Sequence, residues 1–313
     1  MITIRKAERA QSKLRIGLSG PSGSGKTYSA LLLARGIASA WEKIVLIDTE
    51  NGSGEMYSNL GAYNVITLSA PFTPEKYTEA IQFAEESKME VIVIDSVSHE
   101  WDGKGGCLEI NEKLAGTKFK GNSWAAWSET TPRHQKFISS ITESDCHILT
   151  TQRSKTDTIQ TEDKKIKKVG LKDIQREGFE YELTANFNID RDSHMAMASK
   201  DRTSMFIDRD PFVITQKIGE EFVVWNKGGI EKAPDTKESE RRVFAKKAKI
   251  MGELKKLGHI PTSAEEVIKL VLEKTQLELV PEQYDEIIMR LSILIDEAAE
   301  QKVEAKSAPA PTA

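Results

Sequence analysis

Residues 14–27 of this chain read Leu14-Arg-Ile-Gly-Leu-Ser-Gly20-Pro-Ser-Gly-Ser-Gly-Lys26-Thr27 and indicate its type of fold. The apolar start of this stretch predicts a buried strand over residues 14–19, and the apolar spacing that follows predicts a helix over 26–39. The residues between them match G-x-x-x-x-G-K-[ST], in the strand, loop and helix context that this pattern requires. The sequence therefore predicts a phosphate-binding loop at the end of a sheet strand.

Such a loop holds a nucleotide through its backbone and two side chains. Its glycines let backbone N–H groups turn toward the phosphates, and the start of the helix adds its dipole. Lys26 is expected to reach the β- and γ-phosphates of ATP, and Thr27 to ligate Mg²⁺. The predicted nucleotide contacts are Gly20, Pro21, Ser22, Gly23, Ser24, Gly25, Lys26, Thr27 and Tyr28.

Three more apolar runs end in polar side chains that suit this chemistry. Asp95 closes the run 91–94 and has the form of a Walker B carboxylate, which holds the Mg²⁺ shell. Glu50 follows the run 44–47 and is a candidate base for the attacking water, although the spacing fits a solvated loop residue equally well. Gln152 closes a fourth run, as a γ-phosphate sensor or as a routine polar strand end.

Strands and helices alternate through the first two-thirds of the chain, which predicts an α/β fold with a mostly parallel sheet covered on both faces. The expected strands are 14–19, 43–48, 64–68, 90–95 and 146–151, and the expected helices are 26–39, 74–87 and 131–143. The last helix is given Thr131 as N-cap and Pro132 as its first residue. Antiparallel strands extending the sheet are expected at 179–189, 194–199, 212–216 and 221–225.

The remainder of the chain has a different pattern. A polar segment with glycine and proline predicts a linker over 229–240, after an ATPase core over 1–228. Three amphipathic segments, one beginning with a capping box of Ser263 and Glu266, predict a small helical bundle over 241–304. The last residues, 305–313, are expected to form a disordered tail.

Composition excludes several classes of protein. The 313 residues carry a formal net charge of -4, so the chain is no polycation that coats nucleic acid indiscriminately. Its two cysteines, Cys107 and Cys146, lie far apart with no C-x-x-C or Cys/His spacing, which suggests neither a disulfide framework nor a zinc site. Apolar runs are too short to span a bilayer, and the first residues lack a signal-peptide core, so we expect a cytoplasmic protein without a membrane partner.

Taken in order, the four strand-end features resemble the core of RecA-type recombinases. Within that superfamily, residues 10–225 are most similar to compact phage-encoded RecA-like ATPases that act in single-strand annealing and recombination. The resemblance implies that Lys26 and Thr27 bind phosphate and Mg²⁺, that Glu50 is the catalytic glutamate, and that Asp95 and Gln152 are the Walker B and sensor residues. It also implies a homo-oligomer in a bacterial host, with ATP sites between subunits that Lys200 and Arg202 of a neighbouring subunit complete.

The same resemblance places two loops against single-stranded DNA. The first covers residues 102–123 and combines glycines with Lys118 and Lys120. The second covers residues 153–172 and has a net charge of +4, although charge alone fits a solvated loop equally well. Its predicted DNA contacts are Arg153, Lys155, Lys164, Lys165, Lys167 and Lys168.

Two other functions remain open at this point. One is a nucleotide-switched interaction module whose C-terminal helices bind a replication or packaging protein, and the other is a hexameric helicase-like motor on the same core. For the annealing function, the expected partners are single-stranded DNA, further copies of the chain, and a single-strand binding protein or a recombinase. DNA-stimulated ATP turnover separates the annealing function from the interaction module.

Overall fold

A computed structural model describes residues 6, 9–160, 166–229, 236–259, 261 and 263–307. The chain divides into two compact units, Met1–Glu231 and Lys232–Ala313. Among the described helices, none is long and apolar enough to pass through a lipid bilayer.

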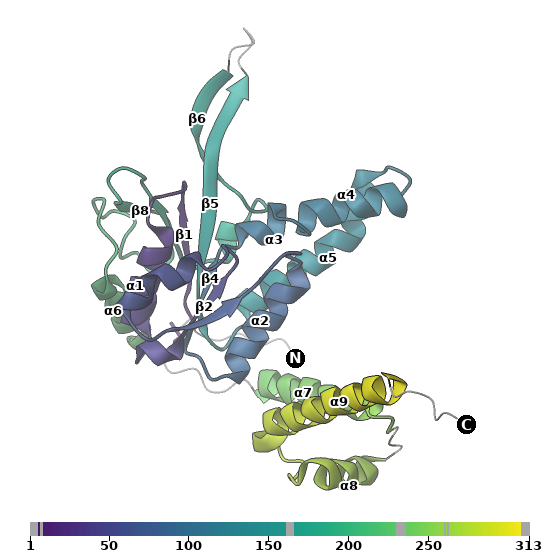
Figure 1. Ribbon diagram of the computed structural model, residues 1–313. Coiled ribbons are helices and arrows are strands. Elements are labelled where there is room, and N and C mark those ends of the chain that lie inside the picture. Colours follow the sequence, from purple (N-terminus) through teal and green to yellow (C-terminus); the bar gives the residue numbers. More distant parts are fainter. Residues whose placement is uncertain are drawn as a thin grey trace. The chain divides into compact units, whose positions relative to one another are not determined.

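The first unit is an α/β domain built on one sheet (Figure 1). The strand order is β3-β2-β4-β5-β1-β7-β8, and the pairs from β3 to β7 are parallel, as the sequence predicts. Two strands are antiparallel: β8 pairs with β7, and β6 pairs with the far half of β5. The strands are β1 Arg15–Gly20, β2 Ile44–Asp48, β3 Asn64–Thr67, β4 Val91–Asp95, β5 His147–Gln160, β6 Ile166–Asp173, β7 Ala185–Ile189 and β8 Ala196–Asp201.

Helices cover both faces of this sheet because its central strands are apolar on both faces. In β4, Val91 and Val93 pack into one core cluster, whereas Ile92 and Ile94 pack into the other. The first cluster includes residues of α1 (Lys26–Ile37) and α6 (Gln216–Lys227), and the second includes residues of α2 (Pro74–Glu86) and α5 (Ser123–Thr142). Continuous burial of this kind fixes the parallel sheet and brings the strand ends to one edge.

Helix α6 replaces a predicted strand. We predicted a strand over 221–225 from its β-prone residues, but Ile218 and Phe222 are buried one helical turn apart. Helix α6 packs closely on α1, since a Cβ on Gly36 would lie 2.0 Å from the Gln216 carbonyl oxygen and a Cβ on Gly219 would lie 2.3 Å from that of Leu33. Tertiary packing therefore overrides the local strand preference.

The antiparallel part of the sheet is also smaller than predicted. Of residues 179–189, the first four form a 3₁₀ helix (Phe179–Glu182), and only β7 is a strand. In the segment 212–216, Phe212 makes an isolated bridge to Ala196.

Helix α5 begins earlier than predicted. The Asn122 side chain accepts a hydrogen bond from the Ala125 N–H (3.0 Å) and caps the helix, so Thr131 is no N-cap and Pro132 lies inside the helix. A proline at this position removes one internal hydrogen bond. Burial of Phe137 and Ile141 against the sheet stabilises the helix beyond it.

Both predicted loops have regular structure. Residues 102–123 contain α4 (Cys107–Thr117), which packs on α5 and extends with it away from the sheet (Figure 1). Residues 153–160 and 166–172 form the far part of β5 and most of β6, a hairpin that projects from the sheet. The prediction of two loops was therefore wrong for these residues and for α4, and Lys164 and Lys165 lie outside the described residues.

In the part of the second unit that the structure describes, the α-helices are α7 (Thr236–Lys256), α8 (Ala264–Thr275) and α9 (Tyr284–Ser307). Ile250, Leu254, Val271, Ile287 and Leu291 lie in its buried cluster. The Ser263 hydroxyl accepts a hydrogen bond from the Glu266 N–H (3.2 Å), as the predicted capping box requires. Helix α7 begins within the segment predicted as linker, and α9 continues to Ser307, so residues 305–307 are helical rather than part of a tail.

His147 makes the stability of the first unit depend on pH. Its Nδ1 accepts a hydrogen bond from the Leu14 N–H (3.0 Å), and burial lowers the pKa of His147 to about 4. The unfolded chain takes up the proton first, near pH 6.5, so this stabilisation is complete above pH 6.5 and is lost as the pH falls toward 4. The loss between pH 7 and pH 5 amounts to about 2 kcal/mol.

His147→Gln, which keeps an acceptor and cannot take up this proton, is expected to remove that part of the pH dependence. All five tryptophans lie between Trp41 and Trp225, so tryptophan fluorescence in urea reports the unfolding of the first unit alone. If the wild type and the variant lose the same free energy of unfolding between pH 7 and pH 5, His147 is not the group responsible.

Candidate functional site

The phosphate-binding loop joins β1 to α1 at the carboxyl edge of the sheet. Gly23 and Gly25 have φ values of +83° and +86°, a conformation that glycine adopts without steric cost. The Lys26 Nζ donates hydrogen bonds to the carbonyl oxygens of Gly20 and Pro21, both at 2.9 Å. The lysine is therefore held over the loop. Burial lowers the pKa of Lys26. This geometry fits a cradle for the phosphates of a nucleotide.

Asp95 lies at the end of β4 and connects the loop to the sheet. Its Oδ2 accepts a hydrogen bond from the Thr27 hydroxyl (2.5 Å), and its Oδ1 accepts one from the Thr151 hydroxyl (2.5 Å). Burial raises the pKa of Asp95, and the two hydroxyls oppose that rise. A carboxylate and a hydroxyl at this distance form the oxygen donor set that Mg²⁺ prefers, so Thr27 and Asp95 would hold the ion where the sequence predicts it.

Glu50 lies just past the end of β2. Its backbone N–H donates to Asp48 Oδ1 (2.6 Å), which gives Asp48 the supporting role of shaping this turn. Its side chain forms an ion pair with Arg153, with 2.9 Å between Glu50 Oε1 and Arg153 Nε. This bond raises the pKa of Arg153. The candidate base is thus joined to the first residue after the predicted sensor.

Gln152 lies beside β1 in the sheet, in register with Ser19. Within the described residues, its buried Nε2 and the buried Ser24 Oγ of the phosphate loop have no hydrogen-bond partner. A buried polar atom without a partner is costly unless a ligand or water satisfies it. The phosphate loop and the strand next to β1 each supply one such atom, which fits a site that binds a polar, phosphate-bearing ligand.

Sequence reasoning missed two threonines of this site. The Thr49 hydroxyl accepts a hydrogen bond from the Ser96 N–H (2.9 Å) and lies 2.8 Å from His99 Nδ1, so it joins β2 to the segment after β4. Thr151 holds Asp95 from the adjacent strand. Each threonine lies next to a predicted residue, Glu50 or Gln152, and this position was the available signal.

Comparison with known proteins agrees with this geometry. Residues 12–210 match a family described as "AAA domain". This chain belongs to the AAA domain family. No curated protein matches the chain.

Among solved structures, the AAA domain protein is similar to one described as "Structural and biochemical analysis of a prototypical ATPase from the type III secretion system of pathogenic bacteria". That match has 15% sequence identity and a TM-score of 0.35, and it covers 89% of this chain and 79% of the other. The family assignment and the site together identify a nucleotide-binding P-loop ATPase domain.

The other predicted residues of the AAA domain lie at different distances from the phosphate loop. Tyr28 follows Thr27 at the start of α1, is 43% exposed, and lies edge-on to Tyr57 with 5.8 Å between ring centroids. Lys200 Nζ donates to the Glu180 carbonyl oxygen, and Arg202 Nη2 donates to that of Tyr181. Both cations thus contact the 3₁₀ helix Phe179–Glu182 of their own chain.

Proposed function

We propose that this AAA domain protein is a Mg²⁺-dependent ATPase whose turnover is stimulated by single-stranded DNA, and that it acts in phage recombination or annealing. The ion pair between Glu50 and Arg153 carries the proposal. It connects the candidate catalytic carboxylate to the first residue of a basic segment, so a polyanion that binds this segment competes with Glu50 for Arg153.

The pair is accessible enough for such a competition. The Arg153 side chain is 43% exposed and the Glu50 side chain is 26% exposed. A half-exposed ion pair contributes about 1 kcal/mol or less, which one phosphate contact can replace. When Arg153 turns to a phosphate, the Glu50 carboxylate is freed to orient the attacking water. DNA occupancy and ATP hydrolysis are coupled in this way.

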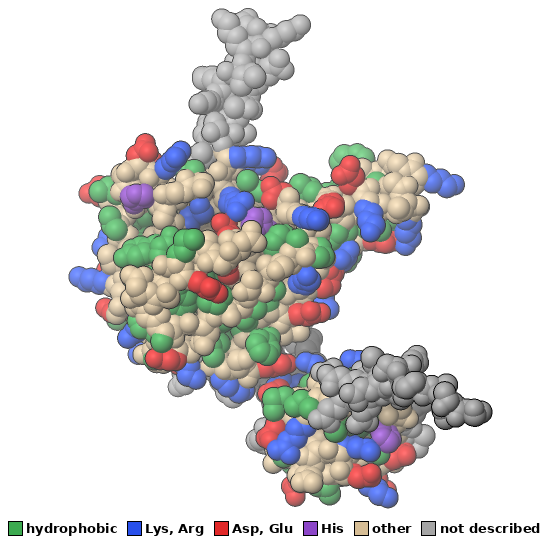
Figure 2. All heavy atoms as spheres, in the orientation of Figure 1, with side chains coloured by type: hydrophobic (Ala, Val, Ile, Leu, Met, Phe, Trp, Pro, Cys, Tyr) green, Lys and Arg blue, Asp and Glu red, His purple; other side chains and the backbone are tan. Residues whose placement is uncertain are grey.

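Two basic segments support binding to DNA backbone phosphates. The first is residues 153–172, whose sequence has a net charge of +4 and which include the far part of β5 and most of β6. Helices α4 and α5 project together from the sheet (Figure 1), and we call this pair the arm. Exposed lysines also occur in the second half of α4 and just after it, where Figure 2 shows Lys and Arg side chains on the arm. They are Lys113, Lys118 and Lys120, of which Lys118 pairs with Glu129.

A cavity of about 580 Å³ lies between the phosphate loop and the base of the hairpin. Gly20 and Gln152 line it on the nucleotide side, and Ser154 and Lys172 line it on the hairpin side. Asp173, also in its lining, accepts hydrogen bonds from the Ser19 hydroxyl (2.7 Å) and the Ser154 hydroxyl (2.6 Å). These bonds join β1, β5 and the end of β6, a route by which a change at Gln152 reaches the hairpin.

The proposal includes a homo-oligomer with ATP sites between subunits. Lys200 and Arg202 lie together at the end of β8, where each donates a hydrogen bond to a backbone carbonyl oxygen and Lys200 also lies over the Tyr181 ring. Two neighbouring cations fit the role of completing a neighbour's site, because fixed positive charge stabilises phosphoryl transfer.

The decisive experiment measures ATP turnover of the full chain with and without single-stranded DNA, while particles from the same sample are imaged. Stimulation by DNA supports the proposal, and translocation by rings favours the helicase-like motor. Turnover that ignores DNA at every salt concentration contradicts the proposal and favours the interaction module. One observation suits that module: Ile268 and Leu272 lie one turn apart on α8, and each is about half exposed.

Removing charge from the hairpin tests the DNA contact itself. Replacing Lys164, Lys165, Lys167 and Lys168 by Ala is expected to weaken binding to single-stranded DNA and to reduce the slope of log K against log salt by up to about 3, because each lost phosphate contact removes about 0.7. The control variant replaces four exposed lysines elsewhere in the first unit, Lys88, Lys136, Lys217 and Lys227. Equal slopes in the two variants would show that DNA contacts the protein at a site other than the hairpin.

A further inference from the structure

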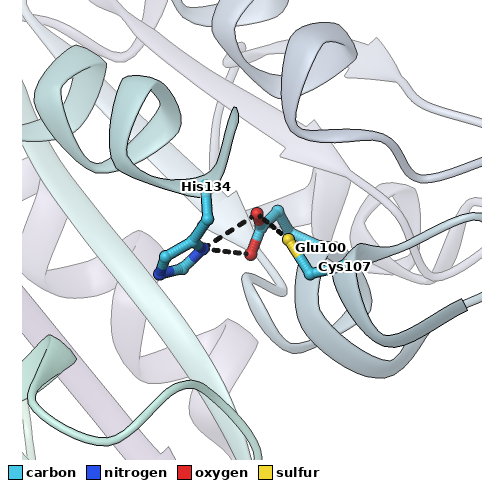
Figure 3. A group of neighbouring side chains, drawn as sticks. All are labelled: Glu100, Cys107 and His134. Carbon is cyan, nitrogen blue, oxygen red and sulfur yellow. Dashed lines mark hydrogen bonds and ion pairs between the residues drawn. The ribbon is translucent and has the colours of Figure 1, made fainter. Parts of the chain in front are cut away.

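Three buried side chains with metal-ligating atoms meet outside the nucleotide site (Figure 3). The Glu100 Oε1 lies 3.0 Å from Cys107 Sγ and 3.0 Å from His134 Nδ1. One ligand atom from each residue falls within 4.8 Å of the other two, and all three residues are buried. The sequence shows no metal-ligand spacing because these residues come from three separate helices, α3 (Ser98–Asp102), α4 and α5.

The backbone between α3 and α4 is shaped to bring Cys107 to Glu100. A Cβ on Gly103 would lie 2.5 Å from the His99 carbonyl oxygen, and a Cβ on Gly106 would lie 2.7 Å from that of Glu100. Only glycine therefore fits this close return of the chain, which places Cys107 at the first turn of α4 against α3. The contact depends on packing around the turn and is not a chance approach of long side chains.

Aromatic rings and one amide enclose the cluster. The Trp101 ring lies edge-on to the His134 ring, with 5.4 Å between centroids, and stacks on Trp127 at 5.6 Å. The Gln175 Nε2 donates to the Val97 carbonyl oxygen (2.9 Å) and lies 3.5 Å from Glu100 Oε2. A largely apolar shell of this kind strengthens electrostatic interactions at its centre and orients the ligands.

Charge and donor type indicate which ion would fit. We propose that Glu100, Cys107 and His134 form a Zn²⁺ site that is separate from the Mg²⁺ site of the ATPase. A thiolate, an imidazole and a carboxylate are the three donor types that zinc takes in proteins. The thiolate and the carboxylate together neutralise the two charges of Zn²⁺, so the buried centre carries no net charge. A water or the second Glu100 oxygen completes four-coordination.

Binding needs only protons to move. In the metal-free protein the Cys107 S–H donates a hydrogen bond to Glu100 Oε1, and His134 Nδ1, 3.0 Å from the same oxygen, holds a proton that it shares with the carboxylate. On binding, the Cys107 sulfur releases its proton to water and forms a bond to the metal. The imidazole exchanges its Nδ1 proton for one on Nε2 through solvent, so that Nδ1 can bind the metal. The reaction is Zn²⁺ plus the thiol giving the zinc thiolate and H⁺, with no change in oxidation state.

A metal at this position would fix the segment that follows Asp95. The neighbours of Glu100 in α3 contact the nucleotide site, because His99 Nδ1 lies 2.8 Å from the Thr49 hydroxyl and the Ser98 Oγ accepts a hydrogen bond from the Arg153 N–H (2.9 Å). The same metal would hold the first turn of α4 to α5. Zinc would therefore rigidify the base of the arm without taking part in ATP chemistry.

The test measures zinc binding by the full chain, free of nucleotide and stripped with a chelator under reducing conditions. After exposure to Zn²⁺ and gel filtration, the wild type is expected to retain about one zinc per chain by elemental analysis. With Co²⁺ in place of zinc, a thiolate-to-cobalt charge-transfer band is expected. Proteolysis within residues 102–123 is expected to slow when zinc is bound.

Two variants keep the hydrogen bonds to Glu100 while removing a ligand, so that folding is preserved. Cys107→Ser and His134→Gln are each expected to weaken zinc binding by more than about 100-fold, because changes to outer partners alone cost 10- to 100-fold. Cys146→Ser is the matched control, since that buried thiol donates to the Met89 carbonyl oxygen away from the cluster, and it should bind zinc like the wild type. The proposal is overturned if the folded wild type retains no zinc, or if Cys107→Ser retains as much as the wild type.

Discussion

Lys26→Ala is expected to lower ATP turnover by about 100- to 1,000-fold, because the variant loses the positive charge that meets the charge developing on the γ-phosphate. Lys26 is buried over the loop, and its Nζ is bound to the two carbonyl oxygens at the start of the loop. A bound triphosphate exchanges these neutral acceptors for charged ones, which strengthens the bonds. Removing the side chain therefore weakens ATP binding as well as hydrolysis.

The measurements are calorimetric ATP binding and the rate of phosphate release. Lys217→Ala on α6 is the control, since this exposed lysine lies on a helix that packs against α1. The control should match the wild type in both assays. Turnover by Lys26→Ala at the parental rate would show that the phosphate loop does not take part in ATP hydrolysis.

The nucleotide site was predictable from the sequence because its residues are fixed by local patterns. The glycines and Lys26 lie in one continuous motif, and Asp95 ends a strand that is apolar on both faces. Gln152 closes the buried part of β5, but the strand continues to Gln160, so the prediction that Gln152 ends a strand was wrong. Parallel strands bring such ends to one edge whatever lies between them. The prediction of Glu50 as the catalytic base depended on the resemblance as well. Its ion pair with Arg153 was not predicted, because it joins residues 103 positions apart.

The parts that the sequence did not predict depend on contacts between distant segments. Residues 221–225 are β-prone, yet the close approach of Gly36 and Gly219 makes them helical. The hairpin of β5 and β6 has no apolar core pattern, so its charged sequence led to the prediction of a loop. The cluster of Glu100, Cys107 and His134 forms only when three helices meet. The spacing of residues along the sequence does not predict such contacts between helices.

Glu50→Gln is expected to keep ATP binding and to lower hydrolysis by about 100- to 10,000-fold, the range that a positioned general base contributes. Glutamine keeps the size of the side chain but cannot accept a proton from water. Glu55→Gln is the control, since Glu55 is an exposed carboxylate in the same segment after β2. Single-turnover hydrolysis and ATP affinity are measured together, and a parental rate for Glu50→Gln would exclude it as the base.

Arg153→Ala tests whether Arg153 restrains Glu50 or serves only as a phosphate contact. Without its partner, Glu50 is free in the absence of DNA, so DNA-free turnover is expected to rise by up to about five-fold, the equivalent of a 1 kcal/mol pair. The ratio of turnover with DNA to turnover without it should then fall toward one. Lys155→Ala is the comparison, because this exposed residue lies two positions further along β5, and it should weaken DNA affinity while leaving maximal stimulation intact. If Arg153→Ala behaves as Lys155→Ala does, Arg153 is a phosphate contact alone and the ion pair does not restrain Glu50.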